Sequence, residues 1–155
     1  MRILVFSDSH GRRRNMEEAL FLHPEAEAVI FLGDGERDFR ELRELFQGPR
    51  FFGVRGNCDF GSSEQGADLI TEAGKRIFFT HGHLFGVKEG LWQLEEAAGR
   101  HCADIALFGH THIAYTAFRD GIYYMNPGSI GSGAASYGLL DITPSGVLMN
   151  TAQLP

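Results

Sequence analysis

Short apolar runs that stop abruptly at polar side chains constrain the fold of this chain more than any other feature. Five such runs cover residues 3–6, 28–32, 51–54, 77–79 and 105–108, and they are rich in Val, Ile and Phe. Continuous apolar runs of this length are typical of strands that are buried on both faces of a sheet. The sequence therefore predicts five interior strands, each followed at once by polar residues.

The segments around these runs predict the other layers. Helical spacing is seen over residues 15–22, 38–46 and 87–98, with Asn15 and Asp38 expected to open the first two helices. Beyond residue 113, two hairpins are expected over 114–125 and 137–149, joined by a Gly- and Ser-rich loop that we predict to be flexible. Strands that alternate with helices, followed by hairpins, predict two packed sheets with helices outside.

Composition narrows the class of protein. A length of 155 residues predicts a single domain over residues 1–155. Fourteen Lys and Arg against twenty Asp and Glu give a net charge of −6, which argues against a stable nucleic-acid partner or binding to an anionic membrane. The two cysteines, Cys58 and Cys102, form no disulfide framework, and no apolar run approaches the roughly 18 residues of a membrane span. We therefore expect a cytoplasmic protein.

Side chains that can bind a metal ion follow all five apolar runs. They are Asp8, His10, Asp34, Asn57, His81, His110 and His112. Ligands gather at the carboxyl ends of strands in open α/β sheets, so we expect these seven residues to converge. A single Asp or His at a strand end is more often a hydrogen-bonded structural group than a ligand. Seven of them at successive strand ends favour a metal site.

Five motifs stand in one order along the chain. They are Asp8-Ser9-His10, Gly33-Asp34, Gly56-Asn57-Cys58-Asp59, Thr80-His81-Gly82-His83 and Gly109-His110-Thr111-His112, and Asn126-Pro127-Gly128-Ser129 follows them. This series resembles that of the calcineurin-like metallophosphoesterases, and more closely that of their minimal phosphodiesterase branch. The resemblance implies a two-sheet α/β/β/α sandwich, a fold shared with the retromer phosphoesterase-like subunit, and a dinuclear metal site.

The resemblance also implies a ligand set. One ion would be held by Asp8, His10 and His112, the other by Asn57, His81 and His110, and Asp34 would bridge both. Carboxylate, imidazole and amide ligands suit manganese, which we expect first, and nickel, iron or zinc as alternatives. Two such ions lower the pKa of a water between them and bind the phosphoryl oxygens. We therefore expect a phosphodiesterase, a phosphoric ester hydrolase in which a metal-bridging hydroxide attacks a small phosphodiester.

Further residues receive roles by the same resemblance. Asp34, Asn57, His81 and Asp59 are expected to act in catalysis, and Asp59 would do so by orienting its neighbours through hydrogen bonds. Cys58 stands where many larger relatives carry a histidine that is thought to assist the leaving group. The minimal branch commonly has Cys there, so the usual general acid is absent and Cys58 is either a spectator or a participant.

Three other residues keep two interpretations each. His83 is equally compatible with a place beside the metal site and with a solvent-facing loop. Arg12 could meet a substrate phosphate, although a solvated arginine at a helix start is the more common case. Asn126 either supports the site or forms a turn before Pro127.

Two other functions compete with a phosphodiesterase. A phosphomonoesterase or nucleotidase would use the same metal ligands on a different ester. A non-catalytic interaction scaffold of the same fold, such as the retromer subunit, would carry a degenerate site, and seven intact ligand candidates argue against it. The sequence does not decide whether the chain forms a homo-oligomer, because it does not show which aromatic side chains of the hairpins are exposed.

Overall fold

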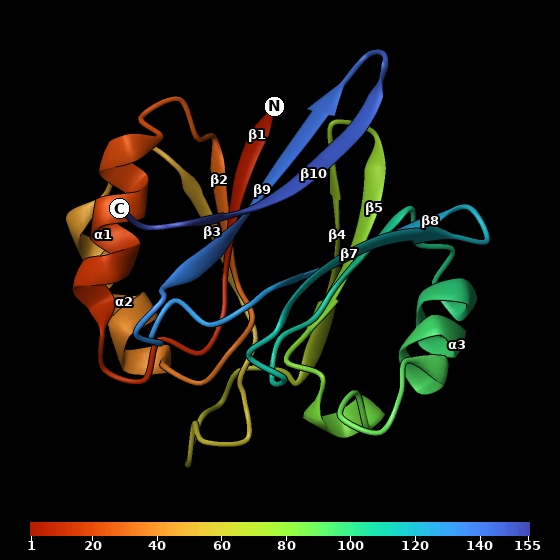
Figure 1. The fold of residues 1–155 in the computed structure, drawn as a ribbon, viewed down its shortest axis with the longest axis horizontal. Coiled ribbons are helices and arrows are strands. Elements are labelled where there is room, and N and C mark those ends of the chain that lie inside the picture. Colours follow the sequence, from red (N-terminus) through yellow and green to blue (C-terminus); the bar gives the residue numbers. More distant parts are fainter.

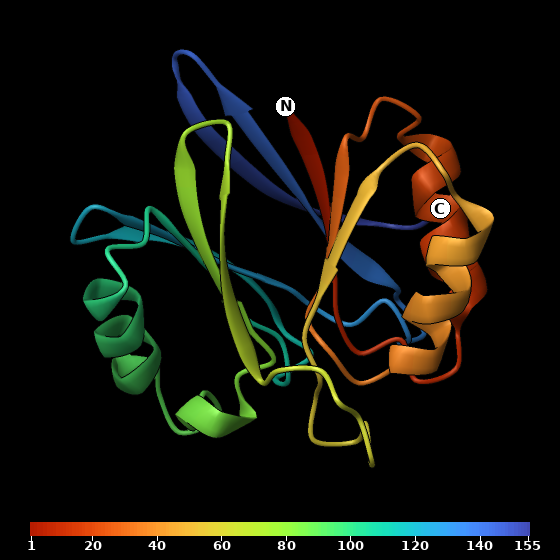
Figure 2. The same cartoon turned by 180° about the vertical axis from the view of Figure 1, so that it is seen from behind.

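Two five-stranded mixed sheets pack face to face, and helices cover their outer faces (Figures 1 and 2). This computed structural model describes residues 1–155. The first sheet contains, in spatial order, β10 (Gly146–Gln153), β9 (Ser136–Thr143), β1 (Arg2–Phe6), β2 (Ala28–Phe31) and β3 (Arg50–Gly53). The second contains β4 (Ala67–Glu72), β5 (Lys75–Thr80), β6 (Ile105–Leu107), β8 (Ile122–Pro127) and β7 (Ala114–Arg119).

The helices complete a four-layer α/β/β/α sandwich, as the sequence predicts. They are α1 (Arg13–Leu22), α2 (Glu36–Leu45) and α3 (Trp92–Arg100), with a short 3-10 helix η1 (His83–Phe85). In Figure 1, α1 and α2 lie against the first sheet and α3 lies against the second. No helix has both the length and the apolar character that crossing a membrane would require.

Both faces of the central strands are buried, which explains the continuous apolar runs. Successive side chains of a strand point to opposite faces. In β1, Ile3 and Val5 belong to the apolar cluster between the sheets, whereas Leu4 and Phe6 pack under α1 and α2, and all four are fully buried. A polar residue at any of these positions would lie in one core or the other.

Parallel pairing places the functional strand ends together. β1, β2 and β3 are mutually parallel in the first sheet, and β5 runs parallel to β6 in the second. Their carboxyl ends meet at one end of the sandwich, at the bottom of Figure 1, where the connecting loops gather. The polar residues that end the five apolar runs therefore lie around one rim that both sheets share.

Several predicted elements differ in the structure. The strand at 51–54 is not buried on both faces, because β3 is an edge strand and Phe51 and Phe52 are half-buried. Strand β4, at an edge of the second sheet, was not predicted, because it has no continuous apolar run. Helix α2 spans Glu36–Leu45 rather than residues 38–46, and α3 begins at Trp92 rather than near residue 87. The two hairpins are confirmed as β7–β8 and β9–β10.

The expected helix caps were wrong. Helix α1 begins at Arg13, so Asn15 lies inside its first turn, and its side chain donates to the Ile130 carbonyl at 2.7 Å. Helix α2 begins at Glu36, before Asp38, whose buried carboxylate accepts hydrogen bonds from the Ser9 hydroxyl and the Gly11 N–H instead. Asn15 connects α1 to the loop after β8, and Asp38 connects α2 to the turn after β1, so long-range contacts outweigh the local capping preference.

Candidate metal centre

The seven ligand candidates come from both sheets and converge at the shared rim. They are Asp8 and His10 after β1, Asp34 after β2, Asn57 after β3, His81 after β5, and His110 and His112 after β6. Two groups have ligand atoms that all lie within 4.8 Å of one another, namely Asp8, His10 and His112, and Asp8, Asp34 and His81.

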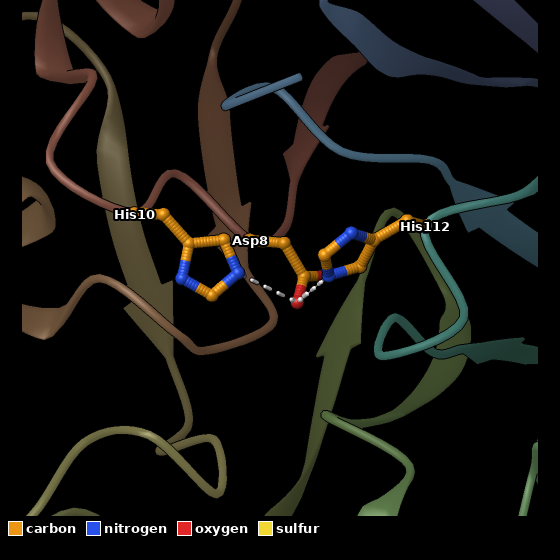
Figure 3. A group of neighbouring side chains, drawn as sticks. All are labelled: Asp8, His10 and His112. Carbon is orange, nitrogen blue, oxygen red and sulfur yellow. Dashed lines mark hydrogen bonds and ion pairs between the residues drawn. The ribbon is translucent and has the colours of Figure 1, made fainter.

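Asp8, His10 and His112 form the first group, which Figure 3 shows. Asp8 Oδ1 lies 3.0 Å from His112 Nε2 and 3.7 Å from His10 Nε2. The second oxygen of Asp8 accepts hydrogen bonds from the Ser7 hydroxyl at 2.5 Å and the His110 N–H at 3.2 Å. Asp8 is fully buried while both imidazoles are partly exposed, so the group opens toward solvent on its histidine side.

The second group surrounds His81, which is fully buried. His81 Nε2 lies 3.0 Å from Asn57 Oδ1, 3.2 Å from His110 Nδ1 and 3.4 Å from Asp34 Oδ2. The other ring nitrogen, Nδ1, donates to the Leu32 carbonyl at 2.7 Å. Since a carbonyl only accepts, Nδ1 carries the proton and Nε2 can act as a ligand, which is the usual arrangement for metal-binding histidines.

Asp34 lies between the two groups. Its Oδ1 accepts a hydrogen bond from the Cys58 N–H at 2.8 Å. Its Oδ2 lies 3.4 Å from His81 Nε2 and 4.0 Å from His10 Nε2, one histidine from each group. Asp8 Oδ1 approaches His81 Nε2 less closely, at 3.9 Å. Each carboxylate therefore has one oxygen held by the protein and one facing the imidazoles.

The electrostatics follow from burial and these short contacts. Burial opposes the charge of Asp34, but its contact with His81 and the hydrogen bond from Cys58 outweigh burial and hold the pKa of Asp34 well below its ordinary range. Burial likewise opposes the charge of His81, yet the carboxylates of Asp34 and Asp8 raise its pKa. Burial and the neighbouring His81 lower the pKa of His110. The buried carboxylates thus favour a positive charge beside His81 and Asp34.

Five of the seven candidates have a left-handed backbone. The φ angles are 56° at Asp8, 44° at His10, 60° at Asp34, 67° at His110 and 60° at His112. This region is sparsely populated by residues with a side chain and costs roughly 1–3 kcal/mol each, and such strain concentrates at functional sites. Together with the carboxylate, amide and imidazole donors, this clustering fits a centre that binds divalent transition-metal ions.

Asp59 holds two of the ligand-bearing turns together. Its carboxylate accepts four backbone N–H groups, from Gly56 at 2.7 Å, Asp34 at 2.8 Å, Gly35 at 2.9 Å and Glu36 at 3.0 Å. Both oxygens are engaged in this way, so Asp59 orients the turns after β2 and β3 rather than facing the imidazoles. The close packing leaves no room for a side chain at Gly56, where a Cβ would lie 2.0 Å from Asp34 Oδ1.

The segment after β8 supports the centre from behind. Asn126 is buried and donates to the Gly109 carbonyl at 2.9 Å, which holds the turn before His110. The Ser129 hydroxyl and the Gly131 N–H both donate to the Asp8 carbonyl, at 2.9 and 3.1 Å. The start of the loop that was predicted to be flexible is therefore buried and hydrogen-bonded. Ser129 was not expected to have a supporting role, although the motif that contains it was noticed.

The remaining candidates lie around this centre. The His83 ring is half-buried beside His81, with ring centroids 5.3 Å apart, and its buried Nδ1 has no hydrogen-bond partner. Burial and His81 lower the pKa of His83. Cys58 is an exposed residue, yet partial desolvation of its thiol and the Asp34 carboxylate raise its pKa. Arg12 is exposed and borders the same cleft as His10 and Asp34.

Fold and site together define the class of protein: an α/β/β/α sandwich with a carboxylate and histidine centre at its strand ends. The family described as the calcineurin-like phosphoesterase superfamily domain matches residues 1–145. The chain therefore belongs to the calcineurin-like phosphoesterase superfamily, and the family resemblance and fold predicted from the sequence are confirmed.

Two curated relatives are similar to this chain over most of their length. A probable metallophosphoesterase of Bacillus subtilis, YsnB, is 37% identical over 131 residues, which cover 84% of this chain and 75% of the relative. The phosphodiesterase YfcE of Escherichia coli K12 is 32% identical over 171 residues, which cover 91% of this chain and 88% of the relative. These relatives support phosphoester hydrolysis as the activity of the family branch.

Solved structures share the fold. A protein of Streptococcus pneumoniae described as a predicted phosphoesterase superposes with a TM-score of 0.78 at 26% identity, covering 97% of both chains. Vacuolar Protein Sorting 29 of Cryptosporidium parvum superposes with a TM-score of 0.77 at 16% identity, covering 99% of this chain and 97% of that one. The second likeness concerns the fold alone and agrees with the relation to the retromer subunit.

Proposed function

We propose that this protein is a phosphodiesterase that uses two divalent metal ions, manganese first, with nickel, iron or zinc as alternatives. The observation that carries the proposal is the position of Asp34, whose Oδ2 faces one histidine of each group, His10 and His81. One ion would be held by Asp8, His10 and His112, and the other by Asn57, His81 and His110. Asp34 would bridge them.

Hydrogen bonds within the chain orient several of these ligands. Two bound divalent ions would supply Lewis acidity toward phosphoryl oxygens and lower the pKa of a water. Hydrogen bonds to Asp8 Oδ2 and Asp34 Oδ1 leave one oxygen of each carboxylate free for an ion. The Leu32 carbonyl fixes the tautomer of His81. The partly exposed His10 and His112 leave the centre open to an incoming phosphate ester.

Two separate hollows that border the centre favour a diester. His10 borders one hollow in the surface and His112 borders another, so each of the two ester substituents could occupy a hollow of its own. A phosphomonoester would occupy only one of these hollows. The name of YfcE, a phosphodiesterase, agrees with this preference.

A comparison of two esters with the same leaving group tests the proposal. We expect kcat/KM for bis(p-nitrophenyl) phosphate to exceed that for p-nitrophenyl phosphate by about tenfold or more, a difference of about 1.4 kcal/mol in transition-state binding. A faster monoester reaction would favour the phosphomonoesterase alternative instead. Absence of turnover on both esters, by folded protein with its metal content verified, would favour the scaffold alternative.

The leaving group should receive little help from Cys58. Its raised pKa keeps the thiol protonated near neutral pH, where an imidazole donates and accepts protons more readily. We expect Cys58→Ala to change aryl diester turnover by less than about tenfold. Cys58→His should accelerate alkyl diesters, which need a proton at the leaving oxygen, more than aryl diesters. Steady-state rates of the three proteins on paired aryl and alkyl diesters measure both effects.

One result would assign a catalytic role to the Cys58 thiol. If Cys58→Ala lost its aryl diesterase activity while its metal content stayed at the wild-type level, Cys58 would be a catalytic residue. The matched control is Cys102→Ala, since Cys102 is the other exposed free cysteine and lies just after α3, away from the centre. That variant should keep wild-type rates on both esters.

A further inference from the structure

The two hollows that flank the centre differ in their charged side chains. The first has a volume of about 810 Å³, and besides His10 and Asp34 it is bordered by Arg12 and Arg14. The second has a volume of about 560 Å³, and besides His112 it is bordered only by uncharged side chains, such as Ser136. A substituent in the first hollow would therefore meet guanidinium groups, whereas one in the second would not.

Most of the acidic groups in the first hollow are already engaged. The Glu41 carboxylate pairs with Arg13 at 2.6 Å and with Arg37 at 3.0 Å. Asp38 accepts hydrogen bonds from Ser9 and Gly11, and Asp59 accepts only backbone N–H groups. Of the carboxylates that border this hollow away from the centre, Glu36 alone has neither an ion pair nor a hydrogen bond.

Arg12 and Arg14 have no carboxylate partner. Both are exposed, and neither lies within 4.0 Å of a carboxylate oxygen. The polar contact of the Arg12 guanidinium is a 3.4 Å hydrogen bond to the Ser132 carbonyl, which leaves its charge uncompensated. Two guanidinium groups without an ion-pair partner therefore border this hollow beside the centre, where they can bind an anionic group.

We propose that Arg12 and Arg14 select phosphodiesters in which one substituent carries a second anionic group, a phosphate, phosphonate or carboxylate. This inference rests on the proposed phosphodiesterase function and names its substrate class. The anionic substituent lies in the Arg12 and Arg14 hollow, and the uncharged substituent lies in the His112 hollow. Guanidinium groups suit this role because they bind phosphate and carboxylate oxygens with paired N–H donors.

Two synthetic diesters with one leaving group test this preference. One is p-nitrophenyl ethyl phosphate, and the other is p-nitrophenyl 2-phosphonoethyl phosphate, whose phosphonate adds an anion that cannot be hydrolysed from its carbon. We expect the wild-type protein to prefer the phosphonoethyl ester by about tenfold in kcat/KM, mainly through KM. The double variant Arg12→Ala/Arg14→Ala should lose this preference and keep its rate on the ethyl ester.

The matched control removes the same total charge from elsewhere on the surface. Arg40 and Arg43 on α2 are exposed, form no ion pair and lie outside the first hollow. Arg40→Ala/Arg43→Ala should retain the preference for the phosphonoethyl ester. An equal loss in both double variants would show a general field effect and overturn the proposal, as would a wild-type protein with no preference.

A binding measurement separates this proposal from the proposed activity. Calorimetric titration of manganese-loaded protein with 2-phosphonoethyl phosphate and with ethyl phosphate requires no turnover. We expect tighter binding of the phosphonoethyl ligand by the wild type and by Arg40→Ala/Arg43→Ala, but not by Arg12→Ala/Arg14→Ala. If neither diester were hydrolysed yet this binding pattern held, the phosphodiesterase function would fail while the anionic subsite would stand. Equal binding of both ligands by the wild type would overturn the subsite.

Discussion

Asp34→Ala is expected to lower kcat/KM on aryl phosphodiesters by at least about 10³-fold, more than alanine at any other ligand position. Asp34 Oδ2 faces His10 and His81 together, so its removal weakens both proposed ion sites at once. His10→Ala and His112→Ala each remove one ligand of a single ion and should cost less. The measurements are kcat/KM at saturating manganese and bound metal per chain.

The matched variant for this experiment is Asp34→Asn. Its amide oxygen can still accept the Cys58 N–H, so the turn after β3 keeps its hydrogen bond while the bridging negative charge is lost. We expect Asp34→Asn to fold and to remain almost inactive, which separates the role in metal binding from the role in folding. If His83→Ala reduced activity more than Asp34→Ala, the assignment of the bridge would be wrong.

Removal of metal should abolish the activity, and manganese should restore it. Protein treated with a chelator and then freed of it is expected to show no turnover of bis(p-nitrophenyl) phosphate. The buried carboxylates of Asp8 and Asp34 then face only imidazoles, and a bound ion would supply their counter-charge. Parallel assays with manganese, nickel, iron and zinc rank the ions.

Manganese binding should also raise the melting temperature of the metal-free protein. An ion that binds only the folded state at 100 times its dissociation constant contributes about 2.7 kcal/mol, or about 5–10 °C for a chain of this size. Differential scanning calorimetry of the stripped and manganese-loaded protein measures this shift. Full activity in the presence of chelator would rule out the two-metal proposal, whatever the melting temperature.

The sequence by itself determined the two-sheet sandwich and the seven residues that meet at its rim. Both follow from local pattern. Ile3 to Phe6 are apolar at every position because alternate side chains enter two different cores, so the strand is visible in the sequence. Once the strands are known, parallel pairing brings their carboxyl ends together, and the residues that end each apolar run must converge.

The edge elements and supporting contacts were decided only by the tertiary structure. Strand β4 lacks a continuous apolar run because it lies at the edge of its sheet, so its residue pattern does not predict a strand. Asn15 and Asp38 favour helix caps locally, but each forms hydrogen bonds to a segment distant in sequence instead. Likewise, no local signal shows that Ser129 holds the Asp8 carbonyl, because the two residues lie 121 positions apart.

The sequence also could not predict which arginines beside the metal centre lack an ion-pair partner. Arg12, Arg13 and Arg14 are three identical residues in a row, and nothing in the sequence distinguishes them. In the folded chain, Glu41 of α2 pairs with Arg13 and leaves its two neighbours free beside the metal centre. Which guanidinium groups lack an ion-pair partner depends on the packing of one helix against another, and the pattern of apolar runs carries no information about that packing.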